Sequence, residues 1–158
     1  MIQVTNLTKT YGSKVAVNNI SFTVEKGEVV GFLGRNGAGK TTTMNMITGY
    51  ISSTGGTVTV DGCDILEQPL EAKRKIGYLP EPPVYTDLTV NEYLDFAADL
   101  KGIAKKNRKK HLDEIKDLVK IADVSGRLIG NLSKGYRQRV GMAQALVGNP
   151  EILILDEP

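Results

Sequence analysis

The residues best suited to chemistry lie in one glycine-rich stretch. Residues 34–41 read Gly-Arg-Asn-Gly-Ala-Gly-Lys-Thr and match the pattern G-x-x-x-x-G-K-[ST]. Glycines in such a loop let the backbone curl, so that successive N–H groups point inward at phosphate oxygens. In this pattern Lys40 is placed to reach the β- and γ-phosphates of a nucleotide, and the Thr41 hydroxyl to bind Mg²⁺. The alternative is a glycine-rich turn that binds nothing.

The last residues of the sequence can supply acidic groups to the same chemistry. Residues 152–155 are all apolar and predict a fully buried strand, with Asp156 and Glu157 at its carboxyl end. Ligands of open parallel sheets bind at that end. Asp156 could hold Mg²⁺ through water, opposite Thr41, and Glu157 could orient or deprotonate an attacking water. The alternative is a strand end that is simply solvated.

A third segment, residues 132–136, reads Leu-Ser-Lys-Gly-Tyr. Ser133 is a suitable N-cap for a helix that runs through Val140 and Leu146 and stops near Gly148. A polar, glycine-containing helix start is a second anion-binding terminus, because its first backbone N–H groups have no partner within the helix. This feature alone is only suggestive, since many helices begin in this way.

The phosphate loop needs a strand before it and a helix after it, and the sequence predicts both. Residues 29–33 predict a buried strand, and residues 40–48 predict a short helix that Gly49 ends. Earlier residues predict β structure with a turn over residues 8–13. Tyr11, in that turn, is either an ordinary partly buried aromatic or a flat ring on which adenine could stack.

The rest of the chain alternates short strands and helices before becoming helical. Thr89 and Glu92 have the spacing of a capping box at the start of the helical part. Strands are predicted at residues 57–60, ending in a turn at Asp61 and Gly62, and at residues 76–79. Helices are predicted at residues 70–74, 89–102 and 133–146. A further helix begins with the basic run at residues 105–110 and carries an apolar face of Leu112, Ile115, Leu118, Val119 and Ala122. The basic run predicts a solvated helix face rather than a membrane or nucleic-acid patch. His111 is predicted to be a solvated surface residue, with no partner that suggests metal binding or catalysis.

The composition is that of a globular protein with one domain. The chain has 158 residues, of which 41 % are hydrophobic and 24 % charged, and its net charge of +2 is too small to indicate a nucleic-acid partner. No run reaches the length of a transmembrane span. Cys63 is the single cysteine and cannot form an internal disulfide, which fits a reducing cytosol.

Taken together, the three segments resemble those of the ATP-binding subunit of an ABC transporter. Residues 34–42 resemble its Walker A motif, residues 152–157 its Walker B motif with the catalytic glutamate, and residues 132–136 the signature motif between them. The order and spacing also agree, and the match runs over essentially the whole chain. The wording Tyr-Leu-Pro-Glu-Pro-Pro at residues 78–83 is similar to that of bacterial ABC-2-type exporter ATPases.

The resemblance implies a head-to-tail dimer, with two ATPs sandwiched between one subunit's Walker A motif and the other's signature. It implies an ATP-binding core of residues 1–84 and 149–158, and a helical subdomain of residues 85–148 that contacts a membrane-spanning permease. The protein would then be cytoplasmic, on the inner face of the membrane. Expected cofactor-binding residues are Tyr11, Gly34, Arg35, Asn36, Gly37, Ala38, Gly39, Lys40, Thr41, Thr42, Ser133 and Gly135; Glu157 and Lys40 are expected to be catalytic, and Thr41, Asp156 and Glu81 to bind Mg²⁺.

Three departures from the family pattern stand out. Tyr136 offers a phenol where the commoner Leu-Ser-Gly-Gly-Gln has an amide. Glu81 stands where a glutamine that contacts Mg²⁺ is usual, and adds negative charge beside the triphosphate. Because Pro158 directly follows the Walker B motif, we expect a fragment that lacks the D-loop, the switch histidine and the further strands and helices.

The sequence thus predicts an α/β fold of the P-loop NTPase type. Its expected parts are a mostly parallel central sheet, an antiparallel β part near the N-terminus and an inserted helical subdomain. The expected function is Mg²⁺-dependent ATP hydrolysis that drives a permease, with export as the expected direction. Two alternatives stay open: a soluble ABC-type ATPase of translation or DNA maintenance, and, for this chain, a nucleotide-binding module with little catalysis.

Overall fold

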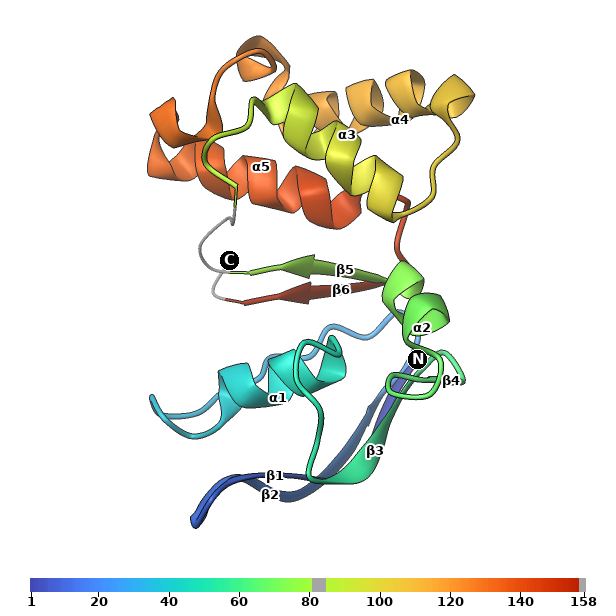
Figure 1. Ribbon diagram of the computed structural model, residues 1–158, viewed down its shortest axis with the longest axis vertical. Helices are drawn as coiled ribbons and strands as arrows, with labels where there is room; N and C mark the ends of the chain where they lie inside the picture. Colours follow the sequence, from blue (N-terminus) through green and yellow to red (C-terminus); the bar gives the residue numbers. More distant parts are fainter. Residues whose placement is uncertain (81–84, 157–158) are drawn as a thin grey trace. The chain divides into compact units, whose positions relative to one another are not determined.

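The computed structural model describes residues 1–80 and 85–156, and the chain forms two compact units. The first is Met1–Lys75 and the second is Ile76–Pro158 (Figure 1). Two predicted site residues, Glu81 and Glu157, lie outside the described residues.

The first unit is built on a four-stranded antiparallel sheet with the order β2-β1-β3-β4. Its strands are β1 (Ile2–Tyr11), β2 (Lys14–Val24), β3 (Gly55–Val60) and β4 (Cys63–Asp64). Asp61 and Gly62, at φ 47° and 78°, form the turn between β3 and β4. The predicted antiparallel β part is confirmed, although β1 runs through Tyr11 and the turn after it is shorter than predicted.

Two helices complete the first unit: α1 (Lys40–Ile47) and α2 (Pro69–Lys75). Both were predicted from the sequence. The chain leaves α1 through Gly49, whose φ of 66° is left-handed. A side chain there would collide with Ile65, because a Cβ would lie 2.9 Å from Ile65 Cγ1. Gly49 therefore both ends the helix and permits its close packing.

The predicted buried strand at residues 29–33 is wrong. These residues have no strand structure, and the exposed fractions of Val29 and Leu33 are 99 % and 94 %. An apolar run becomes a strand only when a neighbouring strand pairs with its N–H and C=O groups. The strands of the first unit pair with one another in antiparallel fashion, and residues 29–33 add none to that sheet. Phe32 still packs near Phe22, with ring centroids 5.7 Å apart.

The second unit contains a parallel pair of strands, β5 (Ile76–Leu79) and β6 (Ile152–Leu155). Helices α3 (Val90–Leu100), α4 (Lys105–Leu118) and α5 (Lys134–Leu146) lie on one side of this pair (Figure 1). Short 3₁₀ turns, η1 (Ala122–Val124) and η2 (Ile129–Asn131), connect α4 to α5. The prediction of a fully buried last strand is only partly right, since Leu153 is 45 % exposed while Ile154 is buried.

Two glycines let α5 pack closely on β5. A Cβ at Gly77 would overlap the carbonyl oxygen of Ala145, and one at Gly141 would lie 2.5 Å from Leu79 Cδ1. The helices share a core of buried residues: Val90, Tyr93, Leu94, Ala97, Ala98, Leu112, Ile115, Ile121, Val124, Ile129, Leu132, Val140, Ala143 and Val147. The close approach of the α5 and β5 backbones thus contributes to the packing of the second unit, in addition to the burial of apolar side chains.

The start of α3 follows the sequence signal closely. The Thr89 hydroxyl accepts from the Glu92 N–H at 3.3 Å, and the Thr89 N–H donates to a Glu92 carboxylate oxygen at 2.8 Å. This is the predicted capping box. The predicted apolar face of the next helix is wrong at Leu118, which is 70 % exposed. α4 ends there, and the chain then turns through Lys120 at φ 58°.

The prediction of a wholly solvated basic run is wrong at Arg108. This residue is buried, and its guanidinium donates to Asp95 at 3.2 Å, to Asp99 at 2.6 Å and to the Ile103 carbonyl at 2.9 Å. His111 also has a partner that the sequence analysis did not anticipate. Its Nε2 accepts from the Gly148 N–H at 3.0 Å.

Candidate functional site

The glycine-rich loop adopts backbone conformations that suit glycine. Gly37 and Gly39 have φ values of 82° and 89°, both in the left-handed region. Gly39 also lies against β2, where a Cβ would be 2.4 Å from the carbonyl oxygen of Ala16. The curl of the loop is stabilised by a hydrogen bond of 3.1 Å from the Ala38 N–H to the Arg35 carbonyl.

The start of α1 is open to an anion. Its N-cap is Gly39, which has no side chain to cap the helix, and the first turn contains no acidic residue. The N–H groups of Lys40, Thr41 and Thr42 therefore have no acceptor within the helix. Thr41 is exposed and Thr42 half-buried in this turn. The helix dipole adds partial positive charge at the same place, so this terminus fits a phosphate group.

Lys40 folds back over the loop. Its Nζ donates to the carbonyl oxygens of Gly34 at 2.6 Å and Arg35 at 3.1 Å. The ammonium group is thus held beside the same backbone that presents the N–H groups. The remaining predicted loop residues, Asn36 and Ala38, are exposed.

Tyr11 ends β1 and is 52 % exposed. The Lys9 ammonium nitrogen lies 5.2 Å from its ring centroid, a cation–π arrangement. The ring is therefore accessible enough for a flat ligand to stack on it, as the sequence analysis proposed, while Lys9 takes up part of its surface. The structure places Tyr11 in the same unit as the loop.

The second unit carries the signature-like turn at the start of α5. The Ser133 hydroxyl oxygen accepts from the Tyr136 N–H at 3.3 Å, which confirms the predicted cap. The N–H groups of Lys134 and Gly135 precede the first intrahelical bonds and are left for another acceptor. Apart from its chain neighbours and the backbone of its own helix, no described atom lies within 4 Å of a Cβ built at Gly135, so its surface is open.

Asp156 follows β6 directly, as predicted. Its N–H donates to the Leu79 carbonyl at 3.1 Å, and its side chain is half-buried. Burial, together with the nearby negative charge of Asp156, raises the pKa of the Tyr78 phenol. The carboxylate therefore emerges at the carboxyl end of a parallel strand pair, next to an aromatic side chain.

The described residues would suit Mg²⁺ only as part of a shared ligand set. Within residues 1–80 and 85–156, no three His, Cys, Asp or Glu side chains are grouped as a protein-only metal site requires. Mg²⁺ usually keeps several waters and takes one or two protein ligands together with substrate phosphates. Thr41 in the first unit carries a hydroxyl oxygen and Asp156 in the second unit a carboxylate, and each is an oxygen donor of the type that Mg²⁺ takes.

The family of the chain follows from its sequence match. The family profile described as "ABC transporter" matches residues 17–158. The chain belongs to the ABC transporter family. The match includes the phosphate loop, the signature-like turn and the acidic end of β6.

Individual relatives give the same result. The bacitracin transport ATP-binding protein BcrA of Bacillus licheniformis is 43 % identical over 159 aligned residues, which cover 100 % of this chain and 51 % of the relative. The chain thus spans about half the length of that relative. A solved ATP-binding subunit of an ABC transporter has a TM-score of 0.91 at 29 % identity, over 100 % of this chain and 66 % of the other.

A second solved structure carries ligands. It is the dimeric, post-hydrolysis state of the ATP-binding cassette MJ0796 bound to ADP and Pi, with a TM-score of 0.88 and 28 % identity over 100 % of this chain and 74 % of the other. These neighbours confirm the α/β P-loop fold predicted from the sequence. Within the part of this ABC family member that the structure describes, no helix has the length and apolar character needed to cross a membrane.

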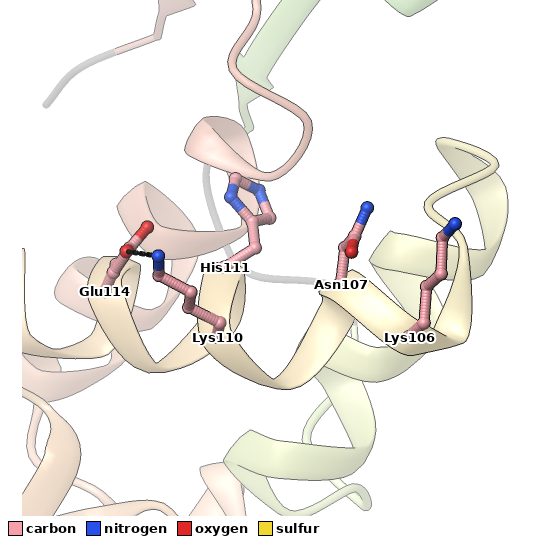
Figure 2. A pocket seen from close by; sticks show the side chains of 5 residues that line it. All are labelled: Lys106, Asn107, Lys110, His111 and Glu114. Carbon is pink, nitrogen blue, oxygen red and sulfur yellow. Dashed lines mark ion pairs between the residues drawn. The ribbon is translucent and has the colours of Figure 1, made fainter.

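Two pockets on the second unit are lined by residues outside the three motifs. One, of about 340 Å³, runs along α4 and is lined by Lys106, Asn107, Lys110, His111 and Glu114. Figure 2 shows these side chains and the ion pair between Lys110 and Glu114 at 3.9 Å. The other, of about 320 Å³, is lined by Tyr85, Thr86, Asp87, Leu88 and Phe96. Neither pocket includes a predicted ATP-site residue.

Sequence reasoning missed two residues that support the signature-like turn. Asp123 accepts a hydrogen bond of 2.9 Å from the Tyr136 hydroxyl, and the Arg139 guanidinium lies 5.5 Å from the centre of the Tyr136 ring. Asp123 stands 13 residues before Tyr136 in the chain, outside any helical or strand spacing, so no local pattern points to it. Arg139 follows Tyr136 at an i, i+3 spacing, which was a usable signal.

Proposed function

We propose that this ABC family member is an ATP-binding and ATP-hydrolysing subunit that works with a permease. The observation that carries the proposal is the uncapped start of α1, bordered by the Gly37–Gly39 curl and by the Lys40 ammonium group. Several N–H groups and one cation converge on a place without acidic side chains in the first helical turn. A triphosphate supplies the negative charge that this place lacks.

Each motif residue has a role within the proposal. Lys40 and the loop amides would hold phosphate oxygens, exchanging the Lys40 bonds to Gly34 and Arg35 for bonds to phosphate. Thr41 and Asp156 would bind Mg²⁺, whose charge offsets that of the triphosphate. Glu157 would orient and deprotonate the attacking water. Glu81 would add a further oxygen ligand for the metal, and Tyr11 would stack on adenine.

The signature-like turn would act on a nucleotide held by a second copy of the chain. The open surface at Gly135 and the free N–H groups at the start of α5 support this role, because they leave room for phosphate. The dimeric state of the related ATP-binding cassette MJ0796 supports the formation of a dimer, and we propose that its arrangement is head-to-tail. Residues 1–84 and 149–158 would form the ATP core, and residues 85–148 the subdomain that contacts the permease on the cytoplasmic face of the membrane. The name of BcrA, a bacitracin transport protein, favours a role in transport, and we propose export.

The two alternatives differ from this proposal in partner and in turnover. A soluble ABC-type ATPase would bind Mg-ATP equally well but would not co-purify with a multi-span membrane protein. A nucleotide-binding module would bind Mg-ATP without hydrolysing it. Transport coupling is favoured because the matched relative BcrA is itself named as a transport protein.

Calorimetric titration with Mg-ATP tests the site. Replacement of Lys40 by Ala removes the only side-chain cation bonded to loop carbonyls in the described structure, and we expect the affinity to fall by about 30-fold or more. Lys106→Ala, an exposed lysine on α4, is the matched control and should bind as the wild type does. Equal affinities of the Lys40→Ala variant and the wild type would remove the phosphate loop from the proposal.

A further inference from the structure

Tyr136 links the start of α5 to the segment that precedes it. Its N–H donates to the Ser133 hydroxyl at 3.3 Å, and its own hydroxyl donates to Asp123 Oδ2 at 2.9 Å. Asp123 belongs to η1, between α4 and α5. Tyr136 therefore bonds to the capping residue Ser133 through its backbone N–H, and to Asp123 of the preceding segment through its side chain.

Two neighbouring arginines attach the same helix end to the same segment. Arg137 Nη1 donates to the Gly130 carbonyl and Arg139 Nη1 to the Lys120 carbonyl, both at 3.4 Å. These are long hydrogen bonds, whereas the Tyr136–Asp123 bond is shorter and has a charged acceptor. Three side-chain hydrogen bonds thus attach the first turns of α5 to the preceding segment, and the bond from the Tyr136 hydroxyl to Asp123 is the strongest of them.

We propose that Tyr136 is a positioning residue: through Asp123 it fixes the Ser133–Tyr136 turn in the orientation that presents the Ser133 hydroxyl to a nucleotide held by a second copy of the chain. This inference rests on the proposed function. It also gives a role to the residue at which the motif departs from Leu-Ser-Gly-Gly-Gln. The Tyr136 hydroxyl does not reach for the nucleotide itself, because it is committed to Asp123 within its own chain.

The surroundings of Tyr136 keep its hydroxyl protonated, so that it can donate a hydrogen bond. The hydrogen bond to Asp123, and next the negative charge of that carboxylate, raise the pKa of the Tyr136 phenol, so the hydroxyl keeps its proton at neutral pH. The Arg139 guanidinium also lies over the Tyr136 ring, in a cation–π arrangement. Asp123 is exposed, so water can solvate its carboxylate without the Tyr136 hydroxyl. The hydrogen bond between Tyr136 and Asp123 therefore stabilises the turn rather than the carboxylate.

The test compares four single variants of the full chain and the double variant that combines Tyr136→Phe with Asp123→Ala. Tyr136→Phe removes the hydroxyl and keeps the ring, Asp123→Ala removes the acceptor, and Asp123→Asn keeps an acceptor oxygen. Tyr50→Phe is the matched control, because the Tyr50 side chain is 79 % exposed. The readouts are amide hydrogen exchange at residues 136 and 137, Mg-ATP affinity by calorimetry, Mg-ATP-dependent self-association by sedimentation, and the urea midpoint.

We expect Tyr136→Phe and Asp123→Ala to exchange these amides about fivefold faster and to self-associate about fivefold more weakly with Mg-ATP. Mg-ATP affinity and the urea midpoint should stay at the wild-type values. The Asp123→Asn variant should show amide exchange and self-association close to those of the wild type, because its side chain keeps an acceptor oxygen. The double variant should behave like either single variant, because both remove the same bond.

Other outcomes overturn the inference in distinguishable ways. Wild-type exchange and self-association in Tyr136→Phe would remove the positioning role alone. A lower urea midpoint with no rescue by Asp123→Asn would make Tyr136 a purely structural residue. Absence of Mg-ATP-dependent self-association in the wild type would overturn the proposed dimer, and the role of Tyr136 in it.

Discussion

Gly39 and Ala16 approach so closely that no side chain fits between them: a Cβ at Gly39 would lie 2.4 Å from the Ala16 carbonyl oxygen. The obstacle is backbone of β2, which cannot move aside as a flexible side chain can. Gly39 is also left-handed, at φ 89°. The last glycine of the phosphate loop is therefore required by the packing of the chain itself, in addition to any ligand.

Gly39→Ala should consequently destabilise the chain as well as impair binding. The left-handed backbone and the collision with Ala16 together predict a loss of about 2–4 kcal/mol in the free energy of unfolding. Gly37→Ala is the matched control: Gly37 has a similar φ of 82°, but apart from its chain neighbours no described atom lies within 4 Å of a Cβ there. We expect Gly37→Ala to cost only about 1 kcal/mol in urea unfolding. Equal losses for the two variants would contradict the packing role of Gly39.

Gly135→Ala should impair self-association without destabilising the chain, unlike Gly39→Ala. Its surroundings are open and it lies in the first turn of α5, where alanine favours the helix. The urea midpoint should stay the same or rise slightly. Mg-ATP-dependent self-association should fall about tenfold or more if a phosphate of the partner's nucleotide approaches this backbone. Unchanged self-association, measured by sedimentation, would count against a role of this turn in trans.

Features set by neighbouring residues were predictable from the sequence. The Thr89–Glu92 capping box, the Ser133 cap and the turn at Asp61 and Gly62 all form as predicted, because each depends on a few consecutive residues. The apolar runs at β5 and β6 also became strands. The phosphate loop pattern belongs to this class, since its glycines specify local backbone angles.

Features that depend on distant partners were not predictable. The apolar character of residues 29–33 could not show whether another strand would pair with them, and none does in the described part of the chain. Arg108 lies in a run of lysines, and only the approach of α3 to α4 brings Asp95 and Asp99 to it. The Tyr136–Asp123 bond is of the same kind, because it depends on the path of the loop between α4 and α5.

Arg108→Met should lower the stability of the helical part of the second unit. Arg108 is buried and joins α4 to two carboxylates of α3, whereas Met keeps much of its volume without the bonds. We expect the melting temperature to fall by about 4–8 °C. Lys109→Met is the control, because the Lys109 side chain is 91 % exposed and its pair with Asp113 is a surface one. A melting temperature of Arg108→Met equal to that of the control would show that the buried ion pairs contribute nothing net.

The stability of α4 should depend on acidic pH through Asp113. Hydrogen bonds from Lys109 and then Lys116 lower the pKa of Asp113 from 3.8 to about 2. A carboxyl whose pKa is depressed in the folded state stabilises that state above its unfolded pKa, and this contribution is lost as the pH falls through the folded pKa. The wild type should therefore lose this part of its stability between about pH 4 and pH 2, the span of those two pKa values.

Asp113→Asn isolates that contribution, because an amide accepts hydrogen bonds without titrating. The difference in urea midpoint between the wild type and Asp113→Asn should be constant near neutral pH and shrink toward zero as the pH falls from about 4 to about 2. Glu114→Gln is the matched control, since the Glu114 carboxylate oxygen lies 3.9 Å from Lys110 and its pair is correspondingly weak. A difference for Asp113→Asn that stays constant down to pH 2 would show that neither lysine binds the Asp113 carboxylate preferentially in the folded chain.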